Sequence, residues 1–360
     1  MLSLRVPIFR RNKLSLLFSP VNRRLPVFQS KNLFSDSFHK VDVVQNEILR
    51  EKTENSGTFK GLVRFKVNRR DQNAIDKKDL VKFLHLSEGE EDLNFCLTVL
   101  QRTISEDQER SFELIWLYMQ MCYIQNLPLQ ATMAWNDPVI RATHYQTDRS
   151  RTSRLYLDLL FTNGKYSQVL DTFNNNFDRL VRKIDCITIT CLACYKLGTK
   201  SDLDAGLHIL DHPNYRVDSP HNVGYQAIAL LAYNLKELHV AYDLLVKYGS
   251  VDMGSKSQKF KAHDVVRKHP VLPTSLMLLV LADLGWLEEA VMLLWSRYGD
   301  IRYLNTFAVQ KVLVAVINSG NDDLAEKMDK IMNIMPKNTT GMLNLDLEEL
   351  LLREIKPRLK

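Results

Sequence analysis

The chain has 360 residues and a formal net charge of +6; 45% of the residues are apolar, 25% are charged, and only 13 are glycine and 11 proline. This composition excludes a wholly disordered chain and favours helix, and the length requires either two domains or one elongated repeat array. The longest apolar runs, 227–233 and 276–282, have seven residues each. They are too short for a membrane span, which needs ~20 residues.

The positive charge is concentrated at the N-terminus. Residues 1–35 contain seven Arg or Lys side chains and no Asp or Glu, which leaves 41 basic against 42 acidic residues in the rest of the chain. An arginine-rich, acid-free segment with Leu2 and Phe9 on one helical face is typical of a mitochondrial transit peptide, and a disordered basic tail is the alternative. We therefore expect a mitochondrial matrix protein whose leader is cut between Leu25 and Asp36.

Residues 36–76 are polar and carry clustered basic side chains, including Arg64, Arg69 and Arg70. No regular apolar period stands out in this stretch. We therefore expect an irregular basic arm before the first helix.

Residues 77–333 repeat one pattern, two amphipathic segments around a turn. In PTSLMLLVLADLGWLEEAVMLL, for example, apolar residues share one helical face before Gly285 and again after it. The turns fall at Glu91, Asn126, Gly164, Gly198, Lys236, Gly285 and Gly320, at intervals of 35, 38, 34, 38, 49 and 35 residues. This period predicts an all-α solenoid of about seven antiparallel helix pairs, each covered by its neighbours.

Small side chains support this register. Closely packed antiparallel helices need small residues where they approach. The position five residues after each turn is small at five of the seven turns. The residues concerned are Cys96, Ala131, Val169, Leu203, Ala241, Ala290 and Ala325. Leu203 is an exception that a longer turn would repair by placing Ala205 in the same slot.

Two segments lie outside the repeat pattern. The 49-residue interval contains a lysine-rich stretch at 249–270, which we expect to be a basic insertion loop. Residues 334–360 include Leu347, Leu350 and Leu351 at helical spacing, with acidic residues early and basic residues late. We expect this segment to form a C-terminal capping helix.

The sequence lacks the residue patterns of the common catalytic and metal sites. Cys191 and Cys194 form one C-x-x-C, but no second ligand pair follows at zinc spacing, so packing in the core is favoured over metal or redox chemistry. Phosphate-loop, dinucleotide, zinc-protease and nucleophile-elbow motifs are missing from the sequence. We expect a non-catalytic protein with no cofactor, metal or small-molecule substrate.

Two short segments resemble a known family. GWLEEA at 285–290 resembles the G-x-L-E-E-A turn of pentatricopeptide repeats, and CYKLG at 194–198 is similar to their C-x-K-x-G helix end. The tetratricopeptide pattern, by contrast, is not met within one first helix. The resemblance covers about residues 77–333 and is strongest to degenerate animal mitochondrial members. It implies a right-handed solenoid that binds single-stranded RNA, roughly one base for each helix pair.

The resemblance also implies which side chains contact RNA. The main base-reading position falls ten residues before each turn on the first helix, and a second position falls at the end of each repeat. Together with neighbouring arginines, these positions give the expected RNA-binding residues: Arg149, Arg151, Arg154, Arg182, Lys183, Thr188, Gln226, Ser275, Asn305 and Gln310. Ser275 with Asn305 is the one pair expected to read a base. The arginines would bind successive phosphates, and an ordinary solvated surface is the alternative.

Two functions are expected from these observations. The first is binding of single-stranded RNA during the maturation, processing or stabilisation of mitochondrial transcripts. Such a protein would support the respiratory chain and would have RNA-processing proteins as further partners. The alternative is a protein-binding helical scaffold, a tetratricopeptide-like adaptor associated with the ribosome or a processing complex, which the near-neutral body favours.

Overall fold

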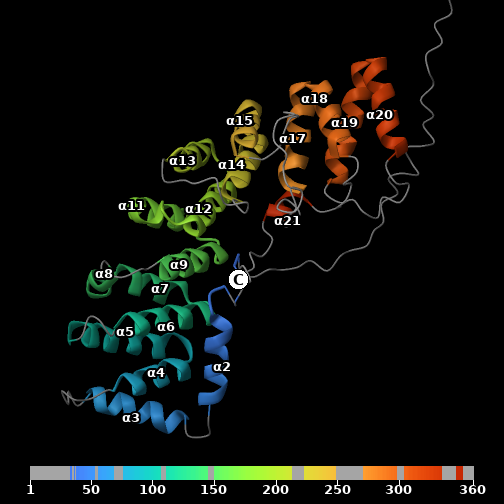
Figure 1. The fold of residues 1–360 in the computed structure, drawn as a ribbon. Coiled ribbons are helices and arrows are strands. Elements are labelled where there is room, and N and C mark those ends of the chain that lie inside the picture. Colours follow the sequence, from blue (N-terminus) through green and yellow to red (C-terminus); the bar gives the residue numbers. More distant parts are fainter. Residues whose placement is uncertain are drawn as a thin grey trace, which may run out of the picture. The chain divides into compact units, whose positions relative to one another are not determined.

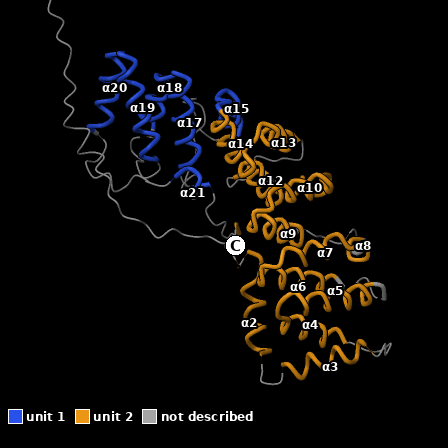
Figure 2. The backbone as a smooth tube through the Cα atoms, turned by 180° about the vertical axis from the view of Figure 1, so that it is seen from behind, with its two compact units in different colours: residues 1–29, 236–351 blue, residues 30–235, 352–360 orange. Residues whose placement is uncertain are grey.

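Figure 1 shows the fold of the chain, a computed structural model that describes residues 33–34, 36, 38–52, 56–68, 76–106, 111–144, 150–212, 223–248, 271–297, 304–334 and 346–351. Within these residues all regular elements are helices, 19 in number. The all-α prediction is thus confirmed for the described part, and the packing is compatible with an α-solenoid. The chain divides into two compact units, residues 30–235 with 352–360 and residues 236–351 with 1–29 (Figure 2).

The unit that contains residues 30–235 holds thirteen of the described helices. They are α2 (Val41–Glu51), α3 (Ser56–Asn68), α4 (Lys77–Leu86), α5 (Gly89–Glu106), α6 (Ser111–Ile124), α7 (Pro128–Asn136), α8 (Pro138–His144), α9 (Ser150–Thr162), α10 (Tyr166–Asn174), α11 (Phe177–Leu180), α12 (Ile184–Leu197), α13 (Lys200–Leu210) and α14 (Val223–Asn234). We call α4, α6, α9, α12 and α14 first helices, and α5, α7, α10 and α13 second helices.

Helix pairs pack on one another in chain order within this unit. Each first helix contacts the first helix of the next pair, from α4 through α6, α9 and α12 to α14. The second helices α5, α7, α10 and α13 each contact the first helix that follows them. Side chains also link consecutive turns, since Asn163 Nδ2 donates to Asn126 Oδ1 at 2.7 Å. Each pair therefore covers the apolar face of its neighbour, as the sequence period predicts.

The predicted turns coincide with left-handed backbone at six of the seven positions. The residues with positive φ are Asn126 (55°), Gly164 (70°), Gly198 (76°), Lys236 (65°), Gly285 (75°) and Gly320 (66°). A residue in this conformation ends a helix and reverses the chain, which is why glycine is frequent there. The prediction at Glu91 is wrong: the turn lies at Ser87–Glu88, and α5 begins at Gly89 with φ 75°.

Burial supports the register read from the small residues. The residues five positions after the turns are fully buried at six of the seven places, and only Ala325 is partly exposed. Leu203 occupies its slot without a shift to Ala205. The close approach instead occurs at Gly206, where a Cβ atom would lie 2.3 Å from Ile228 Cδ1. Glycine therefore allows α13 to meet α14.

The unit that contains residues 236–351 continues the same pairing. Its described helices are α15 (Leu238–Tyr248), α17 (Val271–Leu284), α18 (Leu287–Arg297), α19 (Thr306–Ser319), α20 (Asp322–Ile334) and α21 (Leu347–Leu351). Helix α17 contacts α15, α18 and α19, and α19 contacts α18 and α20. In chain order, α17 and α19 are first helices, and α18 and α20 are second helices. Helix α17 is buried along almost its whole length, because neighbours cover it on several sides.

The N-terminal part differs from the sequence-based expectation. Residues 36–76 contain two helices, α2 and α3, where an irregular arm was expected. Leu33 and Phe34, at the end of the expected leader 1–35, are buried in the core, at 4% and 1% exposure. The apolar stripe of α2 consists mainly of Val41, Val44 and Ile48, which is too narrow to stand out from a polar stretch.

Within the expected capping segment 334–360, the structure describes the end of α20 and one short helix, α21. Helix α20 ends at Ile334, and α21 packs on α17 with Leu351 buried at 3% exposure. The rest of the expected capping segment 334–360 and the expected insertion 249–270 lie outside the described residues. None of the helices in the described part combines the length and hydrophobicity that a bilayer crossing needs.

Candidate functional site

An ion pair brings together the N-terminal ends of α9 and α12, one repeat apart in the sequence. Arg154, in the first turns of α9, lies 2.9 Å from the Asp185 carboxylate in the first turn of α12. Arg151 precedes Arg154 by one helical turn, and Arg182 with Lys183 directly precedes α12. The described members of the two arginine clusters predicted from the sequence therefore lie on either side of this ion pair, and we call this region the α9–α12 edge.

Basic side chains outnumber acidic ones at the surface of the α9–α12 edge. Arg151, Arg179 and Arg182 are exposed and Lys183 is half-buried. Two carboxylates are also accessible there, Asp178 and the Asp185 side chain that pairs with Arg154. The N-termini of α9 and α12 add partial positive charge, because their first backbone N–H groups have no partner within the helix. Phosphate groups bind well to such a combination of guanidinium groups and helix N-termini.

Arg154 itself is not open to a ligand. Its side chain is 13% exposed, and its guanidinium carbon lies 3.9 Å from the centroid of the Phe38 ring. The guanidinium also donates to the Phe38 carbonyl oxygen at 3.4 Å, in addition to its ion pair with Asp185. The prediction that Arg154 contacts RNA is therefore not supported by its position. The cause is a chain segment more than a hundred residues away, which local spacing does not reveal.

A buried carboxylate next to Arg154 holds the same N-terminal segment. Asp158 on α9 is 0% exposed and lies 2.7 Å from Nε2 of His39, which is also 0% exposed. The backbone N–H groups of Leu33 and Phe34 donate to Asp158 at 3.3 and 3.4 Å, and the Tyr123 hydroxyl donates at 3.0 Å. This cluster was not predicted. A signal was present, because Asp158 interrupts the apolar run LYLDLLF at 155–161 and a buried carboxylate requires partners.

Three of the expected base-reading residues are buried and engaged within the protein. Thr188 is 4% exposed, Ser275 is 0% exposed and Asn305 is 3% exposed. The Asn305 side chain caps α19 by accepting from the N–H groups of Phe307 and Ala308, and its own N–H donates to Ser275 Oγ at 3.2 Å. The structure does bring Ser275 and Asn305 together, but as a helix cap and its support. Neither presents a free edge to a base.

The remaining expected residues are only partly accessible. Gln226 on α14 is half-buried, and its amide donates to the Tyr225 hydroxyl at 3.5 Å. Gln310 on α19 is also half-buried. Arg149 lies outside the described residues. Of the expected set, Arg151 and Arg182 are therefore the exposed members, and Lys183 is partly accessible beside them.

The cysteines pack in the core, where their thiols are poorly reactive. All five are free and buried. Burial raises the pKa of the Cys186 and Cys194 thiols to about 12, and that of Cys191 well above its ordinary value. A thiol is a poor nucleophile and metal ligand under these conditions, because the reactive form is the thiolate. Within the described residues, no group of three His, Cys, Asp or Glu side chains is placed to hold a metal ion.

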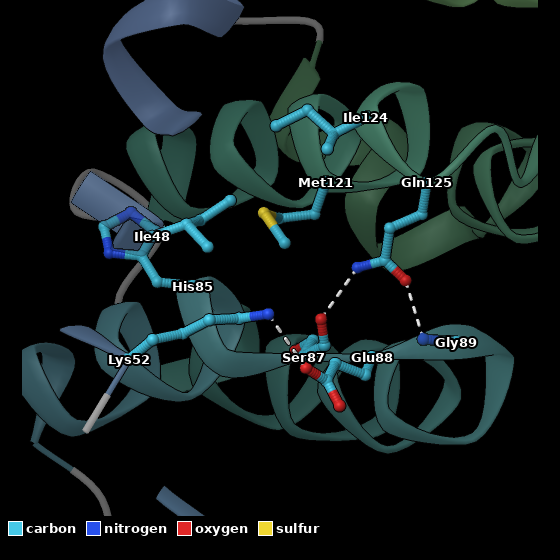
Figure 3. Close-up of a pocket in the computed structure, with 9 residues that line it drawn as sticks. All are labelled: Ile48, Lys52, His85, Ser87, Glu88, Gly89, Met121, Ile124 and Gln125. Carbon is cyan, nitrogen blue, oxygen red and sulfur yellow. Dashed lines mark hydrogen bonds and ion pairs between the residues drawn. The ribbon is translucent and has the colours of Figure 1, made fainter. Parts of the chain in front are cut away.

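A pocket of about 250 Å³ lies between α2, the α4–α5 turn and the C-terminal end of α6 (Figure 3). Several of its polar groups pair with each other: Lys52 lies 3.1 Å from Glu88, and Gln125 donates to the Ser87 carbonyl oxygen at 2.9 Å. His85 also lines it, and burial lowers the pKa of this imidazole. The pocket is best explained as an incompletely filled joint between α2 and the first helix pair.

Comparisons with models of known protein families, with curated protein sequences and with solved structures found no match to the chain. The functional interpretation therefore depends on the α9–α12 edge and on the faces of the first helices.

Proposed function

We propose that the protein is a non-catalytic RNA-binding protein of the mitochondrial matrix, built as a right-handed solenoid of about seven helix pairs like the pentatricopeptide repeats that its sequence resembles. It acts in the maturation, processing or stabilisation of mitochondrial transcripts, and thereby supports the respiratory chain. The observation that carries this proposal is the α9–α12 edge, where the exposed Arg151 and Arg182 lie beside two helix N-termini. The arginine-rich leader supports the location.

The mode of binding we propose is recognition of the RNA backbone. The buried positions of Thr188, Ser275 and Asn305 do not favour a code of one base for each helix pair. Guanidinium groups bind phosphates irrespective of the base, so affinity with little sequence preference is expected from this edge. Sequence selection would then fall to further contacts or to partner proteins.

Binding of a fluorescent oligouridine to the full chain tests the proposal. The double variant R151E/R182E should lower the affinity by about tenfold or more, because both guanidinium groups are exposed and face solvent. It should also reduce the slope of log affinity against log salt by roughly 1.4, the value for two lost phosphate contacts on a single strand. The control is R102E, which makes the same substitution at an exposed arginine of the second helix α5. Equal binding by all three proteins would reject the proposed edge.

A specific observation also favours the alternative, a protein-binding scaffold. On the first helix α19, Phe307, Val314 and Ile317 are 60%, 53% and 39% exposed, and their spacing places them on one face with Gln310. An apolar face at an expected base-reading position suits a partner helix better than RNA. Under this alternative, V314E would abolish co-purification of a partner protein while R151E/R182E would not affect it.

A further inference from the structure

The N-terminal segment from residue 33 to residue 52, which we call the strap, is anchored mainly on first helices, and Lys52 at its end also pairs with Glu88 in the α4–α5 turn. Near its start it meets α9 through Asp158, and near its end Glu51 lies 3.4 Å from Lys82 on α4. Between these points α2 packs on α6 as well as α4, and in Figures 1 and 2 it runs across both helices. The strap thus crosses α9, α6 and α4 in the reverse of chain order.

The first helices bind the strap as they would bind a peptide ligand. Asp158 accepts from the backbone N–H groups of Leu33 and Phe34. Side chains of the first helices also donate to carbonyl oxygens of the strap. Arg154 donates to that of Phe38. Gln120 on α6 donates to those of His39 at 3.0 Å and Lys40 at 3.4 Å. Main-chain groups of the strap are therefore satisfied by side chains of α6 and α9, as in the recognition of extended peptides.

The strap residues at this contact are also packed as a core. Phe34 stacks on Phe38 with ring centroids 4.8 Å apart, and the His39 ring lies 4.9 Å from that of Tyr123. Phe34 and His39 are 1% and 0% exposed. The burial of these rings and the hydrogen bonds to Asp158 make this segment part of the folded unit, because an uncovered Asp158 would be a buried carboxylate without partners.

We propose that the strap closes the first-helix face of α4, α6 and α9 against RNA. In this unit RNA then meets the α9–α12 edge, since α12 and α14 are themselves buried along most of their length. Arg154 and Gln120, which would otherwise face a ligand, are strap anchors and do not bind RNA. The carboxylate of Asp158 beneath the strap would itself repel phosphate. This proposal rests on the RNA-binding function and specifies where on the unit it takes place.

Crosslinking with a thiouridine-substituted oligouridine, followed by identification of the crosslinked peptides, tests the closed face. In the wild-type full chain, crosslinks should fall on peptides of the α9–α12 edge, which carry the exposed Arg151, Arg179 and Arg182. The variant D158N both loosens the strap and removes the repelling charge, so additional crosslinks should appear on peptides of α6 and of the middle of α9. D171N, the same change at an exposed carboxylate of α10, is the matched control and should behave as wild type.

The outcomes separate the closed face from the RNA-binding function. Wild-type crosslinks on α6 or on Tyr156–Thr162 would overturn the closed face while upholding RNA binding. A second outcome also overturns the closed face. In it, hydrogen exchange shows that the strap of D158N is released while α12 and α14 stay protected, and D158N nevertheless gains no crosslinks. An absence of crosslinks in both proteins would overturn the RNA-binding function, and the closed face would fall with it.

Discussion

The buried Asp158 carboxylate accepts more hydrogen bonds from the strap than any other anchor described above, so replacing Asp158 by Asn should loosen it. Oδ2 of Asp158 accepts from His39, from the Tyr123 hydroxyl and from the Phe34 N–H, and Oδ1 accepts from the Leu33 N–H. Asparagine has nearly the same shape but carries no charge, and its amide nitrogen cannot accept a hydrogen bond. The substitution therefore tests the hydrogen bonds to the carboxylate with little change in packing.

The magnitude follows from these four contacts. Hydrogen bonds to a charged group are roughly twice as strong as neutral ones, so the three donors on Oδ2 each lose about 0.5–1 kcal/mol. The N–H of Leu33 would face the amide group and lose about 1 kcal/mol more. The free energy that holds the strap should thus fall by about 3 kcal/mol. Because about 1.4 kcal/mol corresponds to a tenfold change, strap amides should exchange roughly a hundredfold faster.

Hydrogen–deuterium exchange read by mass spectrometry provides the assay. Peptides from residues 33–44 should show the acceleration in D158N, whereas peptides of α17, in the other unit, should not change. D171N should match the wild type throughout, since the Asp171 side chain is exposed. An exchange rate for residues 33–44 within about threefold of wild type would mean that Asp158 does not anchor the strap.

Three further predictions concern packing, thiol reactivity and the N-terminus of the mature protein. G206A should lower the urea midpoint of unfolding, with a net loss of stability of about 1 kcal/mol, because its Cβ would lie 2.3 Å from Ile228 Cδ1. The control G61A, at a glycine of α3 with nothing within 4 Å, should be neutral or stabilising. Equal effects of the two variants would contradict the tight approach of α13 to α14. Iodoacetamide at roughly pH 8 should leave native Cys194 unlabelled, since burial raises its pKa to about 12, and rapid labelling would contradict its role in the core. Mass spectrometry of the imported protein should find a mature chain that starts at or before Leu33, whose buried side chain the fold retains, and a start after this residue would contradict the strap.

Much of the local architecture could be predicted from the sequence, because it depends on nearby residues. The apolar period and the turn residues are local signals, and six of the seven turn positions carry positive φ as a helix-ending residue should. The seventh, Glu91, was misplaced because acidic residues near Gly89 belong to the first turn of α5, where the helix dipole favours them.

The site was predicted less well, because it depends on contacts distant in sequence. His39 and Asp158 are separated by 119 residues, and no local pattern in residues 36–76 indicates that they fold against α9. The base-reading role given to Asn305 was a more avoidable error. An Asn directly before an apolar helical run is a common N-cap, and this pattern was visible in the sequence. Arg151 and Arg182 are exposed, as a surface contact to RNA requires, and their binding of RNA stays a prediction.

Crosslinking of the protein to RNA in intact mitochondria tests the central claim most directly. The full chain with its own leader is expressed, irradiated and purified under denaturing conditions, and the attached RNA is quantified. RNA should be recovered with the wild type and with R102E, and most of it should be lost with R151E/R182E, which removes the exposed guanidinium groups of the α9–α12 edge. Recovery no higher than that of non-irradiated samples, or recovery unchanged by R151E/R182E, would contradict RNA binding at this edge.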